Sequence, residues 1–326
     1  MGVDYMNPVS TREYGIDAYR VFLMFGIVLL HSCGVVCGHP TTWLAHLFMP
    51  CVPGFVLISG WFGLSFKPLK VFKLYALALY AVVVVQLIRM WTGESFDHRM
   101  MFDMWRSYWF LNAYVVLLFV VGLLNKCVAS ESKLGIGAFL FLVFGWGWLV
   151  TIPIIKDYVP ASSGVEACSS LMMAGVYVVG RLMRIGKIKP FLNGYINGVV
   201  IGVSVLAVGI GFCWYTSPFS LVIAMAGFFL FKNSYFVQKM GKYLAWISPS
   251  CFTVYLLHSR GTFGFPVMSS LEESLIGAGL NIYIVYLLTA IITFGVCVFL
   301  DVPRRVVGGL VHVIIHNYTK SKDVGR

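Results

Sequence analysis

Two polar side chains in the first long apolar stretch could do chemistry together. The stretch reads IDAYRVFLMFGIVLLHS and carries Arg20 near its start and His31 near its end. Eleven residues make about three helical turns, so both side chains share one face of a helix and lie about 16.5 Å apart along its axis. A histidine exchanges protons near neutral pH, and a guanidinium binds phosphate. The pair predicts a general base at one end and an anion-binding cation at the other.

The same spacing also has a structural explanation. Arg20 can extend toward the membrane surface and pair with Asp17, three residues earlier on the helix, while His31 makes a hydrogen bond that serves packing. Spacing within one pair does not separate these two readings. Polar residues at membrane depth are nevertheless costly, and for that reason they are candidates for function.

The composition shows that a membrane must surround these residues. Of the 326 residues, 59% are hydrophobic and 11% are charged, whereas soluble domains are about 45–50% apolar and about 25% charged. So little polar surface cannot cover a chain of this size in water, which excludes a soluble enzyme. The eight cysteines include no CxxC pair, so no disulfide or zinc framework is predicted.

Apolar runs long enough to cross a bilayer recur along the chain, and they lack the strict alternation of barrel strands. We predict an all-α integral membrane protein, a bundle of about ten transmembrane helices. It forms one domain over residues 1–326, with an N-terminal segment 1–15, a C-terminal tail 303–326 and no separate soluble domain. The predicted spans are 16–37, 47–66, 71–91, 108–125, 134–152, 168–185, 192–214, 218–231, 249–265 and 279–302.

The distribution of positive charge predicts the orientation. If the N-terminus is cytoplasmic, all but five of the 24 lysines and arginines lie on the cytoplasmic side. The positive-inside rule then places both termini in the cytoplasm. The net charge of +11 is thus a sign of topology, and no nucleic acid partner is predicted. The five predicted external residues are Arg89, Arg99, Arg106, Lys156 and Arg260.

Five blocks of sequence together resemble one family. They are GIDAYR with its Arg20-to-His31 spacing, FVLISGWF (55–62), YWFLNAYVVLLFVVGLLN (108–125), FTVYLLHS (252–259) and DVPRRV (301–306). In content and order they resemble the acyltransferase 3 family of bacterial membrane proteins, from residue 11 to about residue 308. A single block would be weak, whereas five in register are specific.

The resemblance implies an acyl-CoA-dependent O-acyltransferase of the bacterial inner membrane. Cytoplasmic acetyl-CoA, or another acyl-CoA, would donate its acyl group to a hydroxyl of a cell-surface or lipid-linked glycan, either directly or through a separate protein. By this analogy His31 is the general base, and Arg20 orients or binds the coenzyme. The expected partners are the acyl-CoA, the sugar acceptor and membrane lipid, with no permanently bound cofactor.

Two further groups of residues match the family blocks. Ser59 belongs to the Ser-Gly block, where it serves either close helix packing or catalysis. Tyr255 and His258 lie one helical turn apart and could face one pocket, as substrate contacts or as hydrogen bonds between spans. Trp109 could stack on a sugar ring or belong to the aromatic belt at the membrane boundary.

Lysines near the start of the third predicted span could bind the phosphates of the acyl-CoA. Lys70 and Lys73 are three residues apart and share a face, but the positive-inside rule alone also explains them. One cluster has the residue types of a metal site: His31, Cys33, Cys37 and His39. Packing explains cysteines at i,i+4 of an apolar helix more simply, so no metal is predicted.

A transporter or flippase of glycan intermediates is the alternative function. Such a protein is expected to have internal repeats and broken helices. The chain has no convincing repeat, although Pro53, Pro153 and Pro249 could break spans. The third class is a non-catalytic membrane scaffold. Such a protein does not require the polar side chains of Arg20 and His31 on one face of a span.

Overall fold

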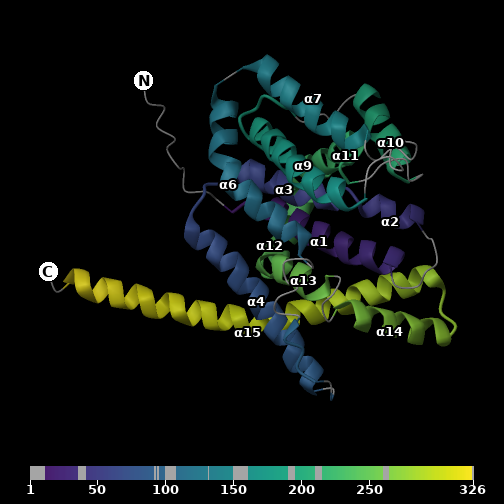
Figure 1. Ribbon diagram of the computed structural model, residues 1–326, viewed down its shortest axis with the longest axis vertical. Coiled ribbons are helices and arrows are strands. Elements are labelled where there is room, and N and C mark those ends of the chain that lie inside the picture. Colours follow the sequence, from purple (N-terminus) through teal and green to yellow (C-terminus); the bar gives the residue numbers. More distant parts are fainter. Residues whose placement is uncertain are drawn as a thin grey trace.

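The computed structural model describes residues 12–35, 42–91, 93, 95–99, 108–130, 132–149, 161–189, 195–209, 215–259 and 264–324. Within these ranges the regular structure is entirely helical, which confirms the predicted all-α class (Figure 1). The helices are α1 (Tyr14–Val35), α2 (Thr42–Phe48), α3 (Cys51–Phe62), α4 (Pro68–Trp91), α6 (Trp109–Ala129), α7 (Lys133–Leu149), α9 (Ala161–Arg184), α10 (Tyr195–Gly209), α11 (Pro218–Asn233), α12 (Tyr235–Leu244), η1 (Ser248–Ser250), α13 (Cys251–His258), α14 (Gly264–Gly277) and α15 (Ile282–Val324).

Five segments of the described chain are long and apolar enough to cross a membrane. They are Tyr14–Cys33, Trp43–Phe62, Pro68–Trp91, Trp109–Ala129 and Ile282–Leu310, and the bent pair of α11 and α12 would make a sixth. The protein is therefore a multi-pass membrane protein, while the count of ten spans stays a prediction. The predicted span 249–265 is not one helix, because α13 ends at His258 and Ser259 has extended backbone.

Helix α1 lies at the centre of the bundle. It packs against α2, α3, α11, α12, α13 and α15, and Figure 1 shows it surrounded by them. Within its candidate span 72% of the residues are buried, against 28% for α4 at the periphery. Side chains such as Leu23 and Val28 are fully enclosed. Arg20 and His31 are thus carried by the most enclosed of the five candidate spans in the described part of the chain.

Helices α3 and α9 approach so closely that their contact admits only glycine. A Cβ at Gly180 would lie 2.5 Å from the carbonyl oxygen of Leu57, and a Cβ at Gly60 would collide with the carbonyl of Tyr177. Small residues of this kind let membrane helices come together. The Ser-Gly block of α3 therefore has a packing role through Gly60.

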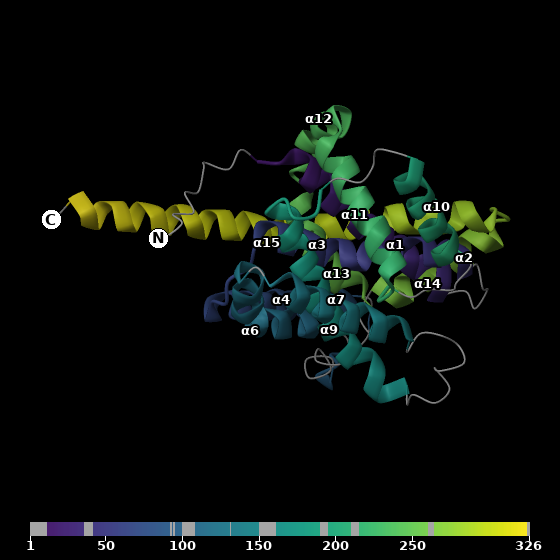
Figure 2. The ribbon, with the colours of Figure 1, turned by 90° about the horizontal axis from the view of Figure 1, so that it is seen from above.

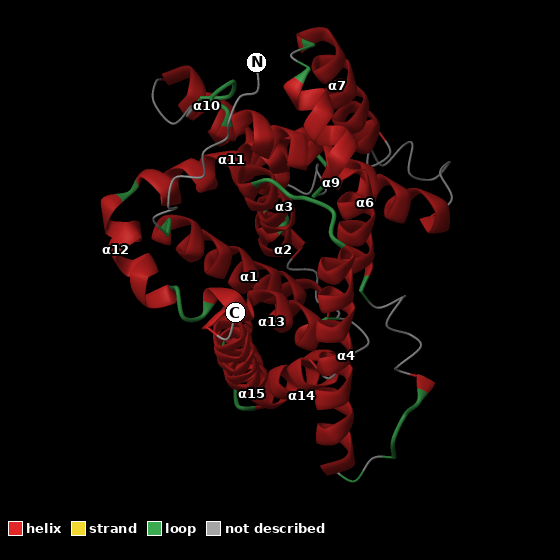
Figure 3. Ribbon diagram, turned by 90° about the vertical axis from the view of Figure 1, so that its left-hand side faces the viewer, coloured by secondary structure: helices red, strands yellow, loops and turns green. Residues whose placement is uncertain are grey.

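A sharp bend separates α11 from α12. The two helices meet at 88°, and Figure 3 shows α12 turned away from α11. Ser234 ends α11 and caps α12 by accepting a hydrogen bond from the amide of Val237. Helix α12 presses on the start of α1, where Gly241 leaves no room for a Cβ beside the Tyr14 carbonyl.

Helix α15 is far longer than a bilayer is thick. Its 43 residues span about 64 Å at 1.5 Å per residue, twice the roughly 30 Å of a bilayer core. The helix continues through Pro303, so the segment that we predicted as a tail from residue 303 is continuous with the last span. Figures 1 and 2 show this part projecting from the body of the molecule.

Candidate active site

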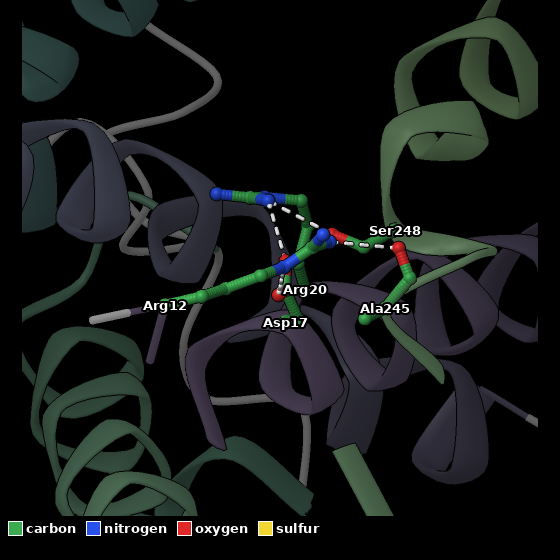
Figure 4. Close-up of polar contacts among 5 residues, drawn as sticks. All are labelled: Arg12, Asp17, Arg20, Ala245 and Ser248. Carbon is green, nitrogen blue, oxygen red and sulfur yellow. Dashed lines mark hydrogen bonds and ion pairs between the residues drawn. The ribbon is translucent and has the colours of Figure 1, made fainter. Parts of the chain in front are cut away.

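The start of α1 holds a network around one buried carboxylate. Asp17 accepts hydrogen bonds from Arg12 Nε at 2.6 Å, from Arg20 Nη1 at 3.2 Å and from the Ser248 hydroxyl at 2.7 Å. Arg20 Nη1 also donates to the Ser248 hydroxyl at 2.8 Å, and Arg12 Nη2 donates to the Ala245 carbonyl at 2.8 Å. Figure 4 shows both guanidinium groups converging on Asp17. This network joins α1 to the turn before α13.

Arg20 has both the structural partner and a remaining binding capacity. The i,i+3 pair with Asp17 is present, as its structural explanation required. All of its bonds within the described part of the chain use Nη1, and its side chain remains 30% exposed. Because a guanidinium has five N–H donors in a planar fork, Nε and Nη2 can still bind an anion.

Other cations gather at the same end of the bundle. Arg304 makes two bonds to the fully buried Asp301, at 2.6 and 2.8 Å, and Arg305 donates to the Ser250 hydroxyl at 3.3 Å. Arg184 and Lys232 both lie near Glu13, at 3.6 and 3.7 Å. These cations all belong to segments that the charge distribution had assigned to one side of the membrane. We call this set, with Arg12, Asp17, Arg20 and Ser248, the charged end.

His31 lies near the opposite end of α1, against a second histidine. The ring centroids of His31 and His258 are 5.0 Å apart, with planes tilted by 41°. His258 is fully buried, and its Nδ1 is 2.6 Å from the Val254 carbonyl oxygen in the preceding turn of α13. Its Nε2 has no hydrogen-bond partner among the described residues. We call the two rings the histidine pair.

Sequence reasoning missed a buried carboxylate in this region. Glu272 of α14 has no exposed surface and interacts electrostatically with Cys33, two residues after His31. Its neighbour Glu273 is exposed. The dipeptide Glu-Glu carried no signal of which side chain faces inward, and the burial follows from long-range packing. A carboxylate buried in a membrane bundle is by default a candidate for function.

Three further candidates from the sequence, Ser59, Tyr255 and Trp109, make structural contacts. The Ser59 hydroxyl donates to the Phe55 carbonyl at 3.3 Å and lies 3.2 Å from the Tyr114 hydroxyl. The Tyr255 hydroxyl accepts from the Phe110 amide at 3.3 Å at the start of α6. The Trp109 ring stacks on Tyr215, with centroids 5.4 Å apart. The bond from Ser59 to Phe55 lies within α3, whereas the other contacts each join two segments of the bundle.

The two lysines at the start of α4 are not joined to Arg20. Lys70 bonds the carbonyl and hydroxyl of Ser65, at 3.2 and 3.4 Å, and Lys73 is exposed. As for metals, no group of three histidine, cysteine or acidic residues lies together in the described ranges. Cys37 and His39 of the cluster considered above fall outside those ranges.

The structure is a bundle of apolar helices whose central span carries a cationic network near its start and a histidine near its end, and such polar groups in a membrane protein are candidates for function. The chain belongs to the acyltransferase 3 family: the family's model, described as an acyltransferase domain, matches residues 13–302. This confirms the resemblance found from the five sequence blocks and makes the chain a membrane acyltransferase. No curated protein and no solved structure matches it.

Proposed function

We propose that this protein is an O-acyltransferase of a bacterial inner membrane. It transfers an acetyl or other short acyl group from cytoplasmic acyl-CoA to a hydroxyl of a cell-surface or lipid-linked glycan. His31 is the general base, and Arg20 binds the coenzyme. The family membership gives the reaction class, and the arrangement of α1 supports the rest.

The observation that carries the proposal is the continuity of α1 from the charged end to the histidine pair. Arg20 and His31 lie on one unbroken helix, about 16.5 Å apart along its axis. A thioester on an extended pantetheine arm has to span a distance of this order between its phosphates and the reacting carbon. The helix thus supplies a phosphate site and a base at matching positions.

The charged end suits the phosphates of a coenzyme. Arg20 retains the donors Nε and Nη2, and Arg305 lies close by, since it bonds Ser250 in the same turn as Ser248. Charge-assisted hydrogen bonds from guanidinium groups are the strongest available contacts to phosphate. Lys70 and Lys73 are proposed only as outlying cations for the same ligand.

The proposed reaction is a direct transfer. His31 takes the proton of the acceptor hydroxyl as its oxygen attacks the thioester carbonyl carbon, and a tetrahedral intermediate forms. When this intermediate collapses, the carbon–sulfur bond breaks, the thiolate leaves, and the imidazolium of His31 returns the proton to the sulfur. The products are the O-acyl glycan and free CoA.

A covalent intermediate on Ser59 is not part of this proposal. A serine nucleophile needs a base in hydrogen-bond contact. The contacts of the Ser59 hydroxyl in the described chain are the Phe55 carbonyl and the Tyr114 hydroxyl, and neither is a base at neutral pH. Tyr255 and Trp109 are likewise assigned to the frame of the site, and not to the acceptor.

The orientation in the membrane is part of the proposal. The charged end faces the cytoplasm, as the positive-inside rule requires, and both termini are cytoplasmic. A reporter fused after residue 326 that is active only in the cytoplasm, such as a fluorescent protein, should be bright. A periplasm-specific enzyme reporter that is active at the same position would contradict the assignment.

The decisive experiment measures release of CoA by the purified protein in proteoliposomes supplied with acetyl-CoA and an acceptor glycan. Wild type should release CoA and acetylate the glycan, and His31→Ala should lower the rate by about 10²–10⁴-fold. His98→Ala is the control, because His98 is exposed in a loop outside the bundle. Full activity of His31→Ala would contradict the assignment of His31 as the general base. Glycan movement without any dependence on CoA would instead establish the transporter.

A further inference from the structure

The histidine pair contains the proposed base, His31, and a second residue, His258, that has no role in the proposed reaction. We propose that His258 is the positioning residue of His31: its Nε2 accepts a hydrogen bond from one nitrogen of His31, and so leaves the other nitrogen unprotonated and directed at the acceptor hydroxyl. The inference rests on the proposed function and names the group that orients its base. It fills the place that a carboxylate occupies in a catalytic triad.

The tautomer of His258 follows from its contact with the backbone. Its Nδ1 lies 2.6 Å from the Val254 carbonyl oxygen, and a carbonyl oxygen can only accept. Nδ1 therefore carries the proton. A fully buried imidazolium with no partner for its second N–H would bear the full cost of desolvation, so the ring is neutral. Nε2 then has a lone pair and can only accept a hydrogen bond.

The lone pair of Nε2 calls for a donor. Within the described chain Nε2 has no partner, although a buried polar atom without a hydrogen bond costs about 1–3 kcal/mol. His31 is the ring beside it, with its centroid 5.0 Å away. Two imidazole rings that share an N–H···N bond have centroids about 5 Å apart, because each nitrogen lies about 1 Å from its centroid.

Closing this bond requires a change in the relative orientation of the two rings. The terminal torsion of a histidine has a broad minimum, and the planes of the two rings are now tilted by 41°. Helix α13 packs on α1, and His258 is the last residue of α13. The short helix therefore holds the Nε2 of His258 beside the ring of His31.

The arrangement has a chemical consequence for the base. Once one nitrogen of His31 donates to His258, the other nitrogen is the one with a lone pair, which general-base catalysis requires. When His31 takes the acceptor's proton, its N–H becomes part of an imidazolium, and the bond to His258 strengthens as a charge-assisted bond. A neutral orienting group does this without the desolvation penalty of a second charge.

The test compares two substitutions that differ in reach. His258→Gln places an amide oxygen near the position of Nε2, where it can still accept from His31. His258→Asn places its amide near the position of Nδ1, where it can satisfy the Val254 carbonyl but cannot reach His31. We expect kcat to fall about tenfold for Gln and about a hundredfold for Asn, with KM for acyl-CoA within about twofold of wild type. Leu256→Met, a volume-conserving change of a buried neighbour, is the control.

Three results would overturn the assignment. They are Asn activity equal to or above Gln activity, a loss that resides in KM, or kcat values near wild type in both variants. Equal unfolding temperatures for Gln and Asn show that the comparison reports on the site and not on the fold. Should either variant fail to fold, the tautomer measurement on the wild-type protein below decides.

A second readout separates this inference from the proposed function. Nitrogen NMR of the histidine-labelled protein should show one ring with Nδ1 protonated, and its unprotonated Nε2 should shift when His31 is replaced by alanine. A signal from His258 that does not respond to His31→Ala contradicts the hydrogen bond. If wild type releases no CoA and the shift is nevertheless seen, the proposed function fails and the hydrogen bond stands.

Discussion

The two ends of α1 are built in opposite ways. At the charged end, Asp17 satisfies three donors, and the network continues into the turn before α13. At the histidine pair, His258 Nδ1 bonds the Val254 carbonyl of its own helix, and its Nε2 has no partner within the described chain. A buried polar network in which every group is hydrogen-bonded makes that part of the structure rigid. A buried acceptor without a partner needs another explanation, such as a donor that it binds during function.

The difference assigns separate tasks to the two regions. The charged end joins α1, η1 and α15, so its loss should appear first in stability. The histidine pair lies where α13 packs on α1, and His258 is fully buried there. Its loss should appear first in turnover. This assignment would be wrong if substitutions at the charged end changed turnover but not stability, or if substitutions at the histidine pair changed stability but not turnover.

The largest effect on stability is expected for Asp17→Ala. The substitution leaves Arg12 and Arg20 without their shared acceptor, and the Ser248 hydroxyl loses the acceptor of its own hydrogen. Since both arginines are partly exposed, we expect a loss of about 2–3 kcal/mol in the free energy of unfolding. Chemical unfolding in detergent micelles measures it. Asp97→Ala, at a partly exposed pair with Arg89, is the control and should change stability by about 0.5 kcal/mol or less.

The next effect separates helix packing from charge. Gly180→Ala inserts a Cβ 2.5 Å from the Leu57 carbonyl oxygen, so α3 and α9 must move apart, at about 2 kcal/mol. The matched control is Gly198→Ala in α10, where nothing lies within 4 Å of the new Cβ. That control should be neutral or stabilising by up to about 1 kcal/mol. Equal unfolding curves for the two variants would refute the close contact.

A smaller effect tests whether the charged end also binds substrate. Arg20→Gln should raise KM for acyl-CoA about tenfold, since one charge-assisted bond is worth about 1.5 kcal/mol. Arg12→Gln is the matched control, because Arg12 bonds the same carboxylate but precedes α1 and is more exposed. Its KM should stay near that of wild type. Steady-state kinetics at varied acyl-CoA concentration measures the effect. Equal KM values in both variants would show that the charged end stabilises the fold and does not bind acyl-CoA.

The smallest effect is expected at Ser59. Ser59→Ala removes weak contacts to Phe55 and Tyr114, so kcat should fall by less than about threefold and stability by about 0.5–1 kcal/mol. Tyr114→Phe removes the same contact from the other side and should behave alike. A covalent nucleophile would instead lose about a thousandfold or more in kcat, and that outcome would reopen the seryl mechanism.

Features that depend on residues close in sequence were predictable. The helix that carries Arg20 and His31 follows from an unbroken apolar run, and the pair of Asp17 and Arg20 follows from their i,i+3 spacing. The family also follows from local blocks. Each of these features is fixed by helical periodicity or by composition, which a single sequence contains.

The remaining features depend on contacts between distant segments. Ser248 reaches Asp17 across most of the chain, and His258 meets His31 only because α13 packs on α1. The predicted span 218–231 ends close to the end of α11 at Asn233, but helix α12 (Tyr235–Leu244) was missed, because it lies between two predicted spans. Sequence periodicity describes one helix at a time and carries no information on which helices pack together.

The bend between α11 and α12 also fixes the position of α12 relative to the start of α1. Helix α12 exposes Tyr235 (85%) and Tyr243 (77%) beside Lys239 and Lys242, a combination of aromatic and basic side chains typical of helices at a membrane surface. Gly241 of α12 packs directly against Tyr14, the first residue of α1. Helix α12 and the start of α1 therefore lie at the same level of the bundle. Arg20 lies less than two helical turns along α1 from that level, and the distance of His31 from it follows from counting residues along the same helix.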